Sequence, residues 1–222
     1  VDVLGWHQRV DADGYTVFDV DVEGKIFGRL GRMRLPLPGK HNMQNALAAL
    51  IAVNQLRVTV DETAAALATF QSTNRRFELL GEVDGVSVIN DYAHHPTAIK
   101  TTLEATRSRY ADADIWAVWQ PHMFSRTQHL LADYAASFGT ADRILITDIF
   151  AAREAPIPGV NGPAIAVAID HPDVRHIADF ETIVATLAEE VDSPAVIIIM
   201  SAGDAPKIGS MYLEQMRATH AD

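Results

Sequence analysis

The chain has 222 residues, 48% of them hydrophobic, which is enough for one large domain or two modest domains with apolar cores. It has no cysteine, so disulfide bonds, thiol catalysis and thiolate metal sites are excluded. The net charge of −11 argues against nonspecific nucleic-acid binding, and an anionic substrate would need a local basic cluster.

Residues 3–35 are predicted to form antiparallel strands. Phe18, Val20 and Val22 alternate with aspartates, which is the period-two pattern of a half-buried strand. The next run, residues 26–37, carries arginines that we expect to form a solvated basic edge: Arg29, Arg32 and Arg34.

A polar cluster, Pro-Gly-Lys-His-Asn-Met-Gln-Asn at residues 38–45, leads into a predicted helix of small apolar residues that reaches about Val53. The N-terminus of such a helix can bind an anion or an adenine edge. Asn42 and Asn45 are one turn apart, so both amides can face one ligand. Alternatively, Asn42 only caps the helix.

A second helix is predicted from about Asp61, its expected N-cap, to Phe70. A polar linker follows, and we place a domain boundary after Phe77, which gives domains 1–77 and 78–222. Arg75 and Arg76 lie at this boundary, where a planar guanidinium could reach a phosphate. A pair of solvated surface arginines is the alternative.

After residue 83, predicted strands and helices alternate, which indicates βαβ crossovers and a mostly parallel sheet. The fold class is therefore α/β, with a Rossmann-like second domain. The strands are expected at 83–89, 115–120, 143–147, 174–177 and 195–201, and the helices at 98–110, 124–138, 162–169 and 179–191.

Three of these strands end in charged or imidazole side chains, which are expected to meet at the carboxyl edge of one sheet, where ligands bind. A carboxylate and two imidazoles after the first strand can hold ribose hydroxyls, orient a phosphate or move a proton. Ordinary loop polarity is the alternative. The candidates are Asp91, His94 and His95 after the first strand, His122 and Arg126 after the second, and Arg153 and Glu154 after the third.

Several motifs carry a family resemblance. They are Pro-Gly-x-His-Asn-x-x-Asn-Ala at 38–46, Arg-Arg-Phe at 75–77, Asn90–Ile99, Gln-Pro-His-x-x-Ser-Arg-Thr at 120–127, the run 147–159, and Ser-Ala-Gly-Asp at 201–204. Together they resemble the Mur ligases, the ATP-dependent amide-forming ligases of peptidoglycan precursor synthesis. The first motif also matches the related folate polyglutamylating ligases, and His-His-Pro-Thr at 94–97 is typical of the muramate-specific branch.

The resemblance implies that residues 1–77 are the β-meander and helical end of the central ATP-binding domain, and that 78–222 form the C-terminal domain. It implies an activity in which ATP phosphorylates the carboxylate of UDP-N-acetylmuramate and L-alanine attacks the acyl phosphate. The chain contains no G-x-x-x-x-G-K-[ST] sequence. We therefore expect a piece of a longer protein, inactive alone, with its Mg²⁺ ligands mainly in the missing N-terminal part.

The resemblance also implies residue roles. The residues expected to contact the nucleotide are His41, Asn42, Asn45, Arg76 and Asp91. The residues expected to contact the amino acid are His122, Arg126, Arg153 and Glu154. The candidate catalytic residues are Arg76, His94 and His95. A related ligase uses an arginine equivalent to Arg153 to grip the carboxylate of its amino acid, whereas the alternative is that Arg153 pairs with Glu154 or Asp148.

The apolar runs are too short to span a membrane and no segment resembles a signal peptide, so a cytoplasmic location is expected, with a role in cell-wall synthesis and thus in cell shape and division. Two other functions stay open: a recycling ligase that attaches a tripeptide, and a nucleotide-binding module without catalysis.

Overall fold

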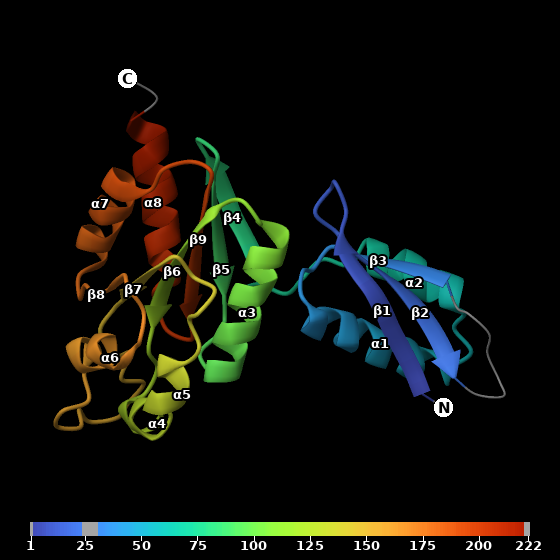
Figure 1. The fold of residues 1–222 in the computed structure, drawn as a ribbon, viewed down its shortest axis with the longest axis horizontal. Coiled ribbons are helices and arrows are strands. Elements are labelled where there is room, and N and C mark those ends of the chain that lie inside the picture. The colour runs from blue at the N-terminus through green and yellow to red at the C-terminus, as the bar shows by residue number, and fades with distance from the viewer. Residues whose placement is uncertain (1, 24–30, 220–222) are drawn as a thin grey trace. The chain divides into compact units, whose positions relative to one another are not determined.

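The computed structural model describes residues 2–23 and 31–219, and the chain divides into two compact units between Ser72 and Thr73 (Figure 1). Arg75, Arg76 and Phe77 therefore belong to the second unit, although the sequence placed the boundary after them.

The first unit contains the predicted antiparallel sheet, in the order β1-β2-β3. Its strands are β1 (Asp2–Val10), β2 (Thr16–Glu23) and β3 (Gly31–Leu35). Phe18 pairs with Met33, and both side chains are buried. The half-buried alternation predicted for this strand is wrong over residues 16–20, because Val17 and Asp19 on the opposite face are buried as well. Arg29 lies outside the described residues.

Arg32 is exposed, as predicted for a solvated edge, and Arg34 is half-buried, but both arginines also form ion pairs. Arg32 Nε donates to Asp19 at 3.1 Å, across the strand pair. Arg34 bonds Asp11 at 2.8 Å and Asp13 at 2.6 Å, and its guanidinium lies 3.6 Å from the ring centre of Tyr15. Arg32 is therefore paired with an aspartate of β2, and Arg34 with two aspartates of the turn between β1 and β2.

Two helices cover this sheet: α1 (Lys40–Asn54) and α2 (Val60–Ala68). Thr59, not Asp61, is the N-cap of α2, because its side chain accepts from the Glu62 backbone while the Glu62 carboxylate accepts from the Thr59 backbone. The core consists of one buried face of the sheet and one face of α1: Phe18, Val20, Met33, Leu35, Met43, Ala46, Leu47 and Leu50.

The second unit is an α/β domain with a six-stranded sheet in the order β4-β5-β9-β6-β7-β8. Only the β4–β5 pair is antiparallel, so the sheet is mostly parallel, as predicted. The strands are β4 (Glu78–Val83), β5 (Val86–Asp91), β6 (Asp114–Gln120), β7 (Arg143–Ile146), β8 (Val174–His176) and β9 (Ala195–Ser201).

Helices cover both faces of this sheet. Figure 1 shows α7 and α8 on one side and α3 on the other, and separate apolar clusters fill the two layers. Every residue of β5 and β9 is buried, because both strands are covered on both faces. The helices are α3 (Pro96–Arg109), α4 (Phe124–His129), α5 (Leu131–Ala135), α6 (Gly162–Ala168), α7 (Phe180–Glu190) and α8 (Pro206–Thr219).

Two predicted elements in this unit were wrong. The expected strand at 83–89 is the end of β4, a turn at Asp84 and Gly85, and most of β5. Positive φ angles of 50° and 77° at this dipeptide form the tight turn. The expected helix at 124–138 divides at Leu130 into α4 and α5.

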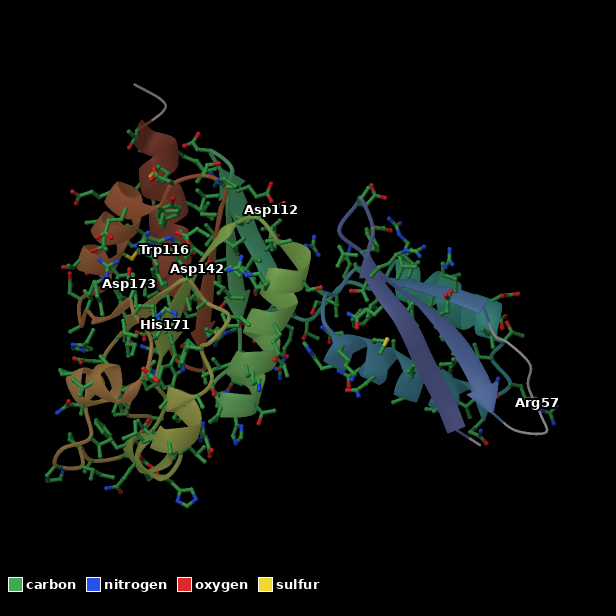
Figure 2. The ribbon with its side chains drawn as sticks, viewed as in Figure 1. Arg57, Asp112, Trp116, Asp142, His171 and Asp173 are labelled. Atoms are coloured by element: carbon green, nitrogen blue, oxygen red, sulfur yellow. The ribbon has the colours of Figure 1, made fainter. Side chains whose placement is uncertain are left out.

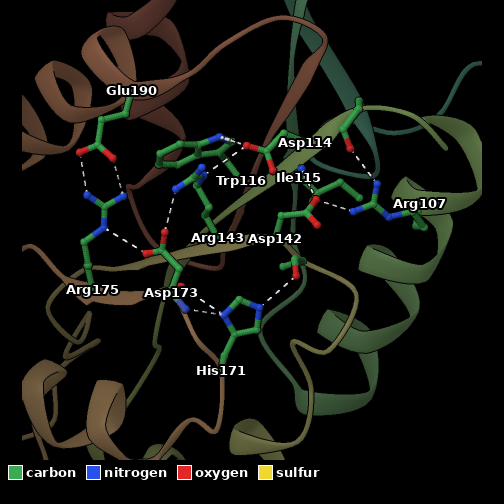
Figure 3. Close-up of polar contacts among 12 residues, drawn as sticks. Arg107, Asp114, Ile115, Trp116, Asp142, Arg143, His171, Asp173, Arg175 and Glu190 are labelled. Carbon is green, nitrogen blue, oxygen red and sulfur yellow. Dashed lines mark hydrogen bonds and ion pairs between the residues drawn. The ribbon is translucent and has the colours of Figure 1, made fainter.

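Ion pairs close the amino edge of the sheet, where β6, β7 and β8 begin (Figure 3). Arg143 bonds Asp114 at 3.2 Å and Asp173 at 2.9 Å. The guanidinium of Arg143 also lies 5.0 Å from the ring centre of the buried Trp116, whose Nε1 donates to Asp114 at 3.0 Å. Arg175 forms a two-pronged pair with Glu190 at 2.7 and 3.0 Å. Each arginine of this network is therefore paired with at least one carboxylate.

His171 and Asp142 extend the network to the backbone (Figures 2 and 3). His171 Nε2 lies 3.0 Å from the Ala141 carbonyl, which can only accept, so Nδ1 accepts from the Asp173 N–H at 3.2 Å. Asp142 pairs with Arg107 and accepts from the N–H of Ile115 at 2.7 Å, at the start of the buried strand β6.

We predict that Asp142→Ala lowers the free energy of unfolding by about 1–3 kcal/mol, because the Ile115 N–H loses its side-chain acceptor. Asp142→Asn keeps an acceptor and should lose less. Urea unfolding of the chain measures both changes. Asp112→Ala is the matched control, because Asp112 is exposed and has no polar partner in the described ranges (Figure 2). Equal effects of Asp142→Ala and Asp112→Ala would contradict the prediction.

Candidate functional site

Loops that follow four parallel strands gather at the carboxyl edge of the six-stranded sheet. Strands β5, β9, β6 and β7 are parallel, so their C-terminal ends share this edge. Two hydrogen bonds join neighbouring loops: the Met123 N–H donates to the Phe150 carbonyl at 2.9 Å, and the Phe150 N–H donates to the Pro121 carbonyl at 2.8 Å. The predicted meeting of strand ends is confirmed.

Asp91 is buried at the end of β5 and its carboxylate is fully engaged. One oxygen accepts from the Phe77 N–H at 2.8 Å, and the other accepts from the Ala93 N–H at 2.8 Å and the Thr102 hydroxyl at 3.4 Å. Burial raises the pKa of Asp91, although these hydrogen bonds and the charge of Arg76 act in the opposite direction. A ribose hydroxyl would have to share these acceptors.

His94 is fixed through its ring and its backbone. Nδ1 lies 2.8 Å from the Tyr92 carbonyl, and because a carbonyl only accepts, Nδ1 carries the proton and Nε2 carries the lone pair. The buried Tyr134 hydroxyl donates to the His94 carbonyl at 2.8 Å, and burial raises the pKa of Tyr134 to about 12. The structure thus presents His94 Nε2 as a proton acceptor.

His122 and Arg126 lie beside His94. The ring centres of His94 and His122 are 6.0 Å apart, and His122 stacks on Phe150 at 5.6 Å. Arg126 Nη1 lies 3.5 Å from His122 Nδ1. Burial lowers the pKa of both histidines below the usual value, and the positive charge of Arg126 acts in the same direction, while the bond to Tyr92 partly opposes the shift for His94. His95, by contrast, is exposed at the N-cap of α3.

The loop after β7 presents Arg153 and holds Glu154. Both Glu154 oxygens accept from Ser125, at 2.9 Å from its N–H and 2.5 Å from its hydroxyl, which lowers the pKa of Glu154. Arg153 is exposed, has a φ of 86°, and makes no ion pair with any described residue. The alternative pairing of Arg153 with Glu154 or Asp148 is therefore wrong, since Asp148 bonds His176 at 2.8 Å.

The turn after β9 is built around the buried amide of Gln120. Its Oε1 accepts from the Ser201 hydroxyl at 2.7 Å and the Ala205 N–H at 3.1 Å, while its Nε2 donates to Asp204 at 2.8 Å. A Cβ on Gly203 would collide with this amide and come within 2.6 Å of the Phe150 ring, so the turn needs glycine here. Ser201, at a position where the related motif has glycine, bonds the Gly203 N–H at 2.8 Å and so supports the turn.

The remaining nucleotide candidates are divided between the two units. In the second unit, Arg76 is exposed, with its guanidinium 5.5 Å from the ring centre of Tyr92. In the first unit, His41 is half-buried and Asn45 is exposed on α1. Asn42 does not cap α1, whose N-cap is Gly39; instead its Nδ2 donates to the Pro38 carbonyl at 2.8 Å.

Tyr134, Gln120, Phe150 and Tyr92 are site residues that the sequence did not single out. Three of them lie in the quoted motifs, so a signal existed. Tyr134 lies 40 residues after its partner His94, and only the fold brings them together.

No group of three or more histidine, aspartate or glutamate side chains is arranged as a metal site within residues 2–23 and 31–219. Within the same residues, no helix has the length and apolar character needed to cross a bilayer.

Comparison with known proteins gives consistent results. The family model for the glutamate ligase domain of Mur ligases matches residues 75–203. A UDP-N-acetylmuramate–L-alanine ligase of Salinibacter ruber is 39% identical over 93% of this chain and 44% of its own length, and one of Mycolicibacterium gilvum is 43% identical over 84% and 40%. The chain thus spans less than half the length of these curated relatives.

Solved structures agree on the fold. The UDP-N-acetylmuramate–alanine ligase of Thermotoga maritima has a TM-score of 0.77 at 20% identity, covering 98% of this chain and 46% of its own. A murein peptide ligase of Psychrobacter arcticus has a TM-score of 0.64 at 27% identity, covering 97% and 44%. Because the family model matches more than half of the chain, including the loops at the carboxyl edge, this chain belongs to the Mur ligase family.

Proposed function

We propose that this chain is the latter part of a ligase that joins L-alanine to the carboxylate of UDP-N-acetylmuramate at the expense of ATP. The observation that carries the proposal is the carboxyl edge, where the ring of His94, the guanidinium of Arg126 on α4 and the guanidinium of Arg153 on the loop after β7 come to one edge of the sheet. These groups suit an amino acid, which offers a proton to remove and a carboxylate to hold. The curated relatives that are named UDP-N-acetylmuramate–L-alanine ligase support this choice.

The attacking amine must first lose a proton, because L-alanine is an ammonium ion at neutral pH. His94 Nε2 is proposed to take that proton, since its lone pair is fixed by the bond from Nδ1 to Tyr92. His95, the other candidate, lies exposed at the N-cap of α3 and is proposed to act only at the periphery of the site.

Arg153 is proposed to hold the carboxylate of L-alanine, because two parallel N–H donors of a guanidinium match its two oxygens. His122 and Arg126 are proposed to flank the same amino acid. Glu154 is proposed to support amino-acid binding indirectly, because its bonds to Ser125 fix the loop that carries Arg153.

In the proposed reaction ATP is a substrate. Its γ-phosphoryl group is transferred to the muramoyl carboxylate, which gives an acyl phosphate and ADP. The exposed Asn45 amide, with His41 and Asn42 beside it on α1, and the exposed Arg76 guanidinium fit a nucleotide chemically. Asp91 is proposed to serve the nucleotide by fixing the segment that carries Arg76. Mg²⁺ is proposed to be bound mainly by residues of the ligase that precede this chain. The work is positioning and charge stabilisation, with no enzyme nucleophile.

The recycling ligase is the second candidate, favoured by the likeness to the murein peptide ligase. L-Alanine is preferred because the curated relatives named as UDP-N-acetylmuramate–L-alanine ligases are more similar, at 39% and 43% identity against 27% for the murein peptide ligase. An assay of the full-length gene product with L-alanine and with the tripeptide distinguishes the two. A cytoplasmic role in peptidoglycan precursor synthesis is part of the same proposal.

We predict that the 222-residue chain folds but has no ligase activity alone, because its sequence lacks the phosphate-binding loop that cradles the β- and γ-phosphates. The assay is phosphate release from ATP with magnesium, UDP-N-acetylmuramate and L-alanine. The full-length gene product is the positive control. Phosphate release coupled to product formation by the chain alone would contradict the prediction.

For Arg153→Ala in the full-length enzyme, we predict that KM for L-alanine rises roughly 30- to 1000-fold, equivalent to about 2–4 kcal/mol, with little change in KM for ATP. Arg153→Lys keeps the charge without the planar fork and should fall in between. Arg153→Gly relaxes the positive φ and should match Arg153→Ala if the side chain, not the backbone, matters. Equal shifts in the two KM values would instead assign Arg153 to loop structure.

For Asp91→Asn we predict a loss of about 1–3 kcal/mol in the free energy of unfolding, because the amide NH₂ would face a backbone N–H donor. Urea unfolding of the chain measures this, with the exposed Asp112→Asn as control. Unchanged stability together with a raised KM for ATP in the full-length enzyme would favour direct ribose binding by Asp91 instead.

A further inference from the structure

The side chain of Arg75 is bonded to a distant part of the sheet. Its Nη2 donates to the carbonyl of Ser201 at 2.5 Å and to that of Gly203 at 3.2 Å, more than a hundred residues along the chain. These carbonyls lie at the end of β9 and in the turn that follows it, where the Gln120 amide accepts hydrogen bonds from Ser201 and Ala205. The guanidinium also lies 4.9 Å from the ring centre of Tyr92. With Nη2 engaged in this way, Arg75 is poorly placed to bind a phosphate.

The backbone around Arg75 is held as firmly as its side chain. The Arg75 N–H donates to Glu78 at 2.7 Å, and its carbonyl accepts from the Tyr92 N–H at 2.7 Å. The Phe77 N–H is bonded to Asp91 at 2.8 Å. Hydrogen bonds therefore fix the residues on both sides of Arg76.

The conformation of this segment is costly for its residues. Arg75 has a φ of 61° and Phe77 a φ of 48°, in the left-handed region that L-residues avoid. Such angles persist where the surrounding contacts over-determine them, and they cluster at functional sites. Between these two residues, Arg76 is exposed, and its guanidinium lies 5.5 Å from the centre of the same Tyr92 ring that Arg75 approaches.

We infer that Arg75 is a positioning residue that clamps the segment 75–77 to the turn after β9 and thereby fixes Arg76 for nucleotide binding. The inference rests on the proposed nucleotide role of Arg76. It assigns the two adjacent arginines different tasks: Arg75 holds the segment in place, and Arg76 contacts the nucleotide.

The test is a double-mutant cycle in the full-length enzyme, with KM for ATP measured at saturating L-alanine and UDP-N-acetylmuramate. Arg76→Ala should raise KM for ATP roughly 10- to 100-fold, as expected for a lost charge-assisted hydrogen bond. Arg75→Ala should raise it by a similar factor. The double variant should be no worse than Arg76→Ala alone, because the clamp acts only through Arg76. Arg75→Lys keeps the positive charge and three N–H donors on a shorter side chain without the planar guanidinium, so it should give a smaller rise, and it covers the case in which Arg75→Ala fails to fold.

Arg57→Ala is the matched control, because Arg57 is an exposed arginine with a φ of 66° in the loop between α1 and α2 (Figure 2). It removes the same charge at a similar backbone angle and should leave KM for ATP unchanged. Hydrogen exchange gives an independent reading of the clamp: the Tyr92 amide should lose protection in Arg75→Ala and Arg75→Lys, but not in Arg57→Ala.

The outcomes separate the inference from the function on which it rests. If Arg76→Ala leaves KM for ATP unchanged, the nucleotide role of Arg76 is wrong, and the inference is wrong with it. If Arg76→Ala raises KM but the effect of Arg75→Ala is absent or adds fully to it, only the inference is overturned. Unchanged protection of Tyr92 in both Arg75 variants overturns it as well.

Discussion

The carboxylate of Asp91 is the contact on which the site of the second unit depends. It accepts hydrogen bonds from three segments: from the Phe77 N–H in the segment 75–77, from the Ala93 N–H in the loop after β5, and from the Thr102 hydroxyl in helix α3. Burying a carboxylate is unfavourable, and the raised pKa of Asp91 reflects that cost. The hydrogen bonds offset the cost and give the loop a single conformation, so the residues that follow Asp91 begin from a fixed point.

The topology of the sheet supplies the second constraint. Strand β9 lies between β5 and β6, so the loops after these three strands meet around one turn. Gln120 fills the space beneath that turn, and Gly203 admits the Phe150 ring that stacks on His122. At the opposite edge, arginines and carboxylates neutralise one another around Trp116 (Figure 3). Arginine side chains such as Arg153 and Arg76 remain exposed at the carboxyl edge, where an anionic substrate would meet them.

The sequence was sufficient for the fold class, because alternation along β2 and the spacing of strands and helices reflect local geometry. It was also sufficient to bring His94, His122 and Arg153 to one sheet edge, since parallel strands leave no other arrangement. The sequence did not predict the turn at Asp84 and Gly85, because the apolar residues on both sides of it resemble one continuous strand. It also did not predict Thr59 as the N-cap of α2, because the nearby Asp61 is an equally suitable N-cap residue.

Pairings between distant residues could not be read from the chain. The bonds from Ser125 to both oxygens of Glu154 are one example. The pairing of Arg32 with Asp19 across the strand pair is another. Tyr134 carried no motif at all, although its hydroxyl fixes His94. These contacts depend on side-chain directions that only the packed structure sets, whereas residue type and spacing decide which loops come together.

The most direct test of this account is a crystal structure of the full-length protein with L-alanine and a non-hydrolysable ATP analogue. We predict that the carboxylate of L-alanine lies within hydrogen-bonding distance of the Arg153 guanidinium, with its amine directed at Nε2 of His94. L-Alanine bound away from the carboxyl edge of the six-stranded sheet would contradict the account.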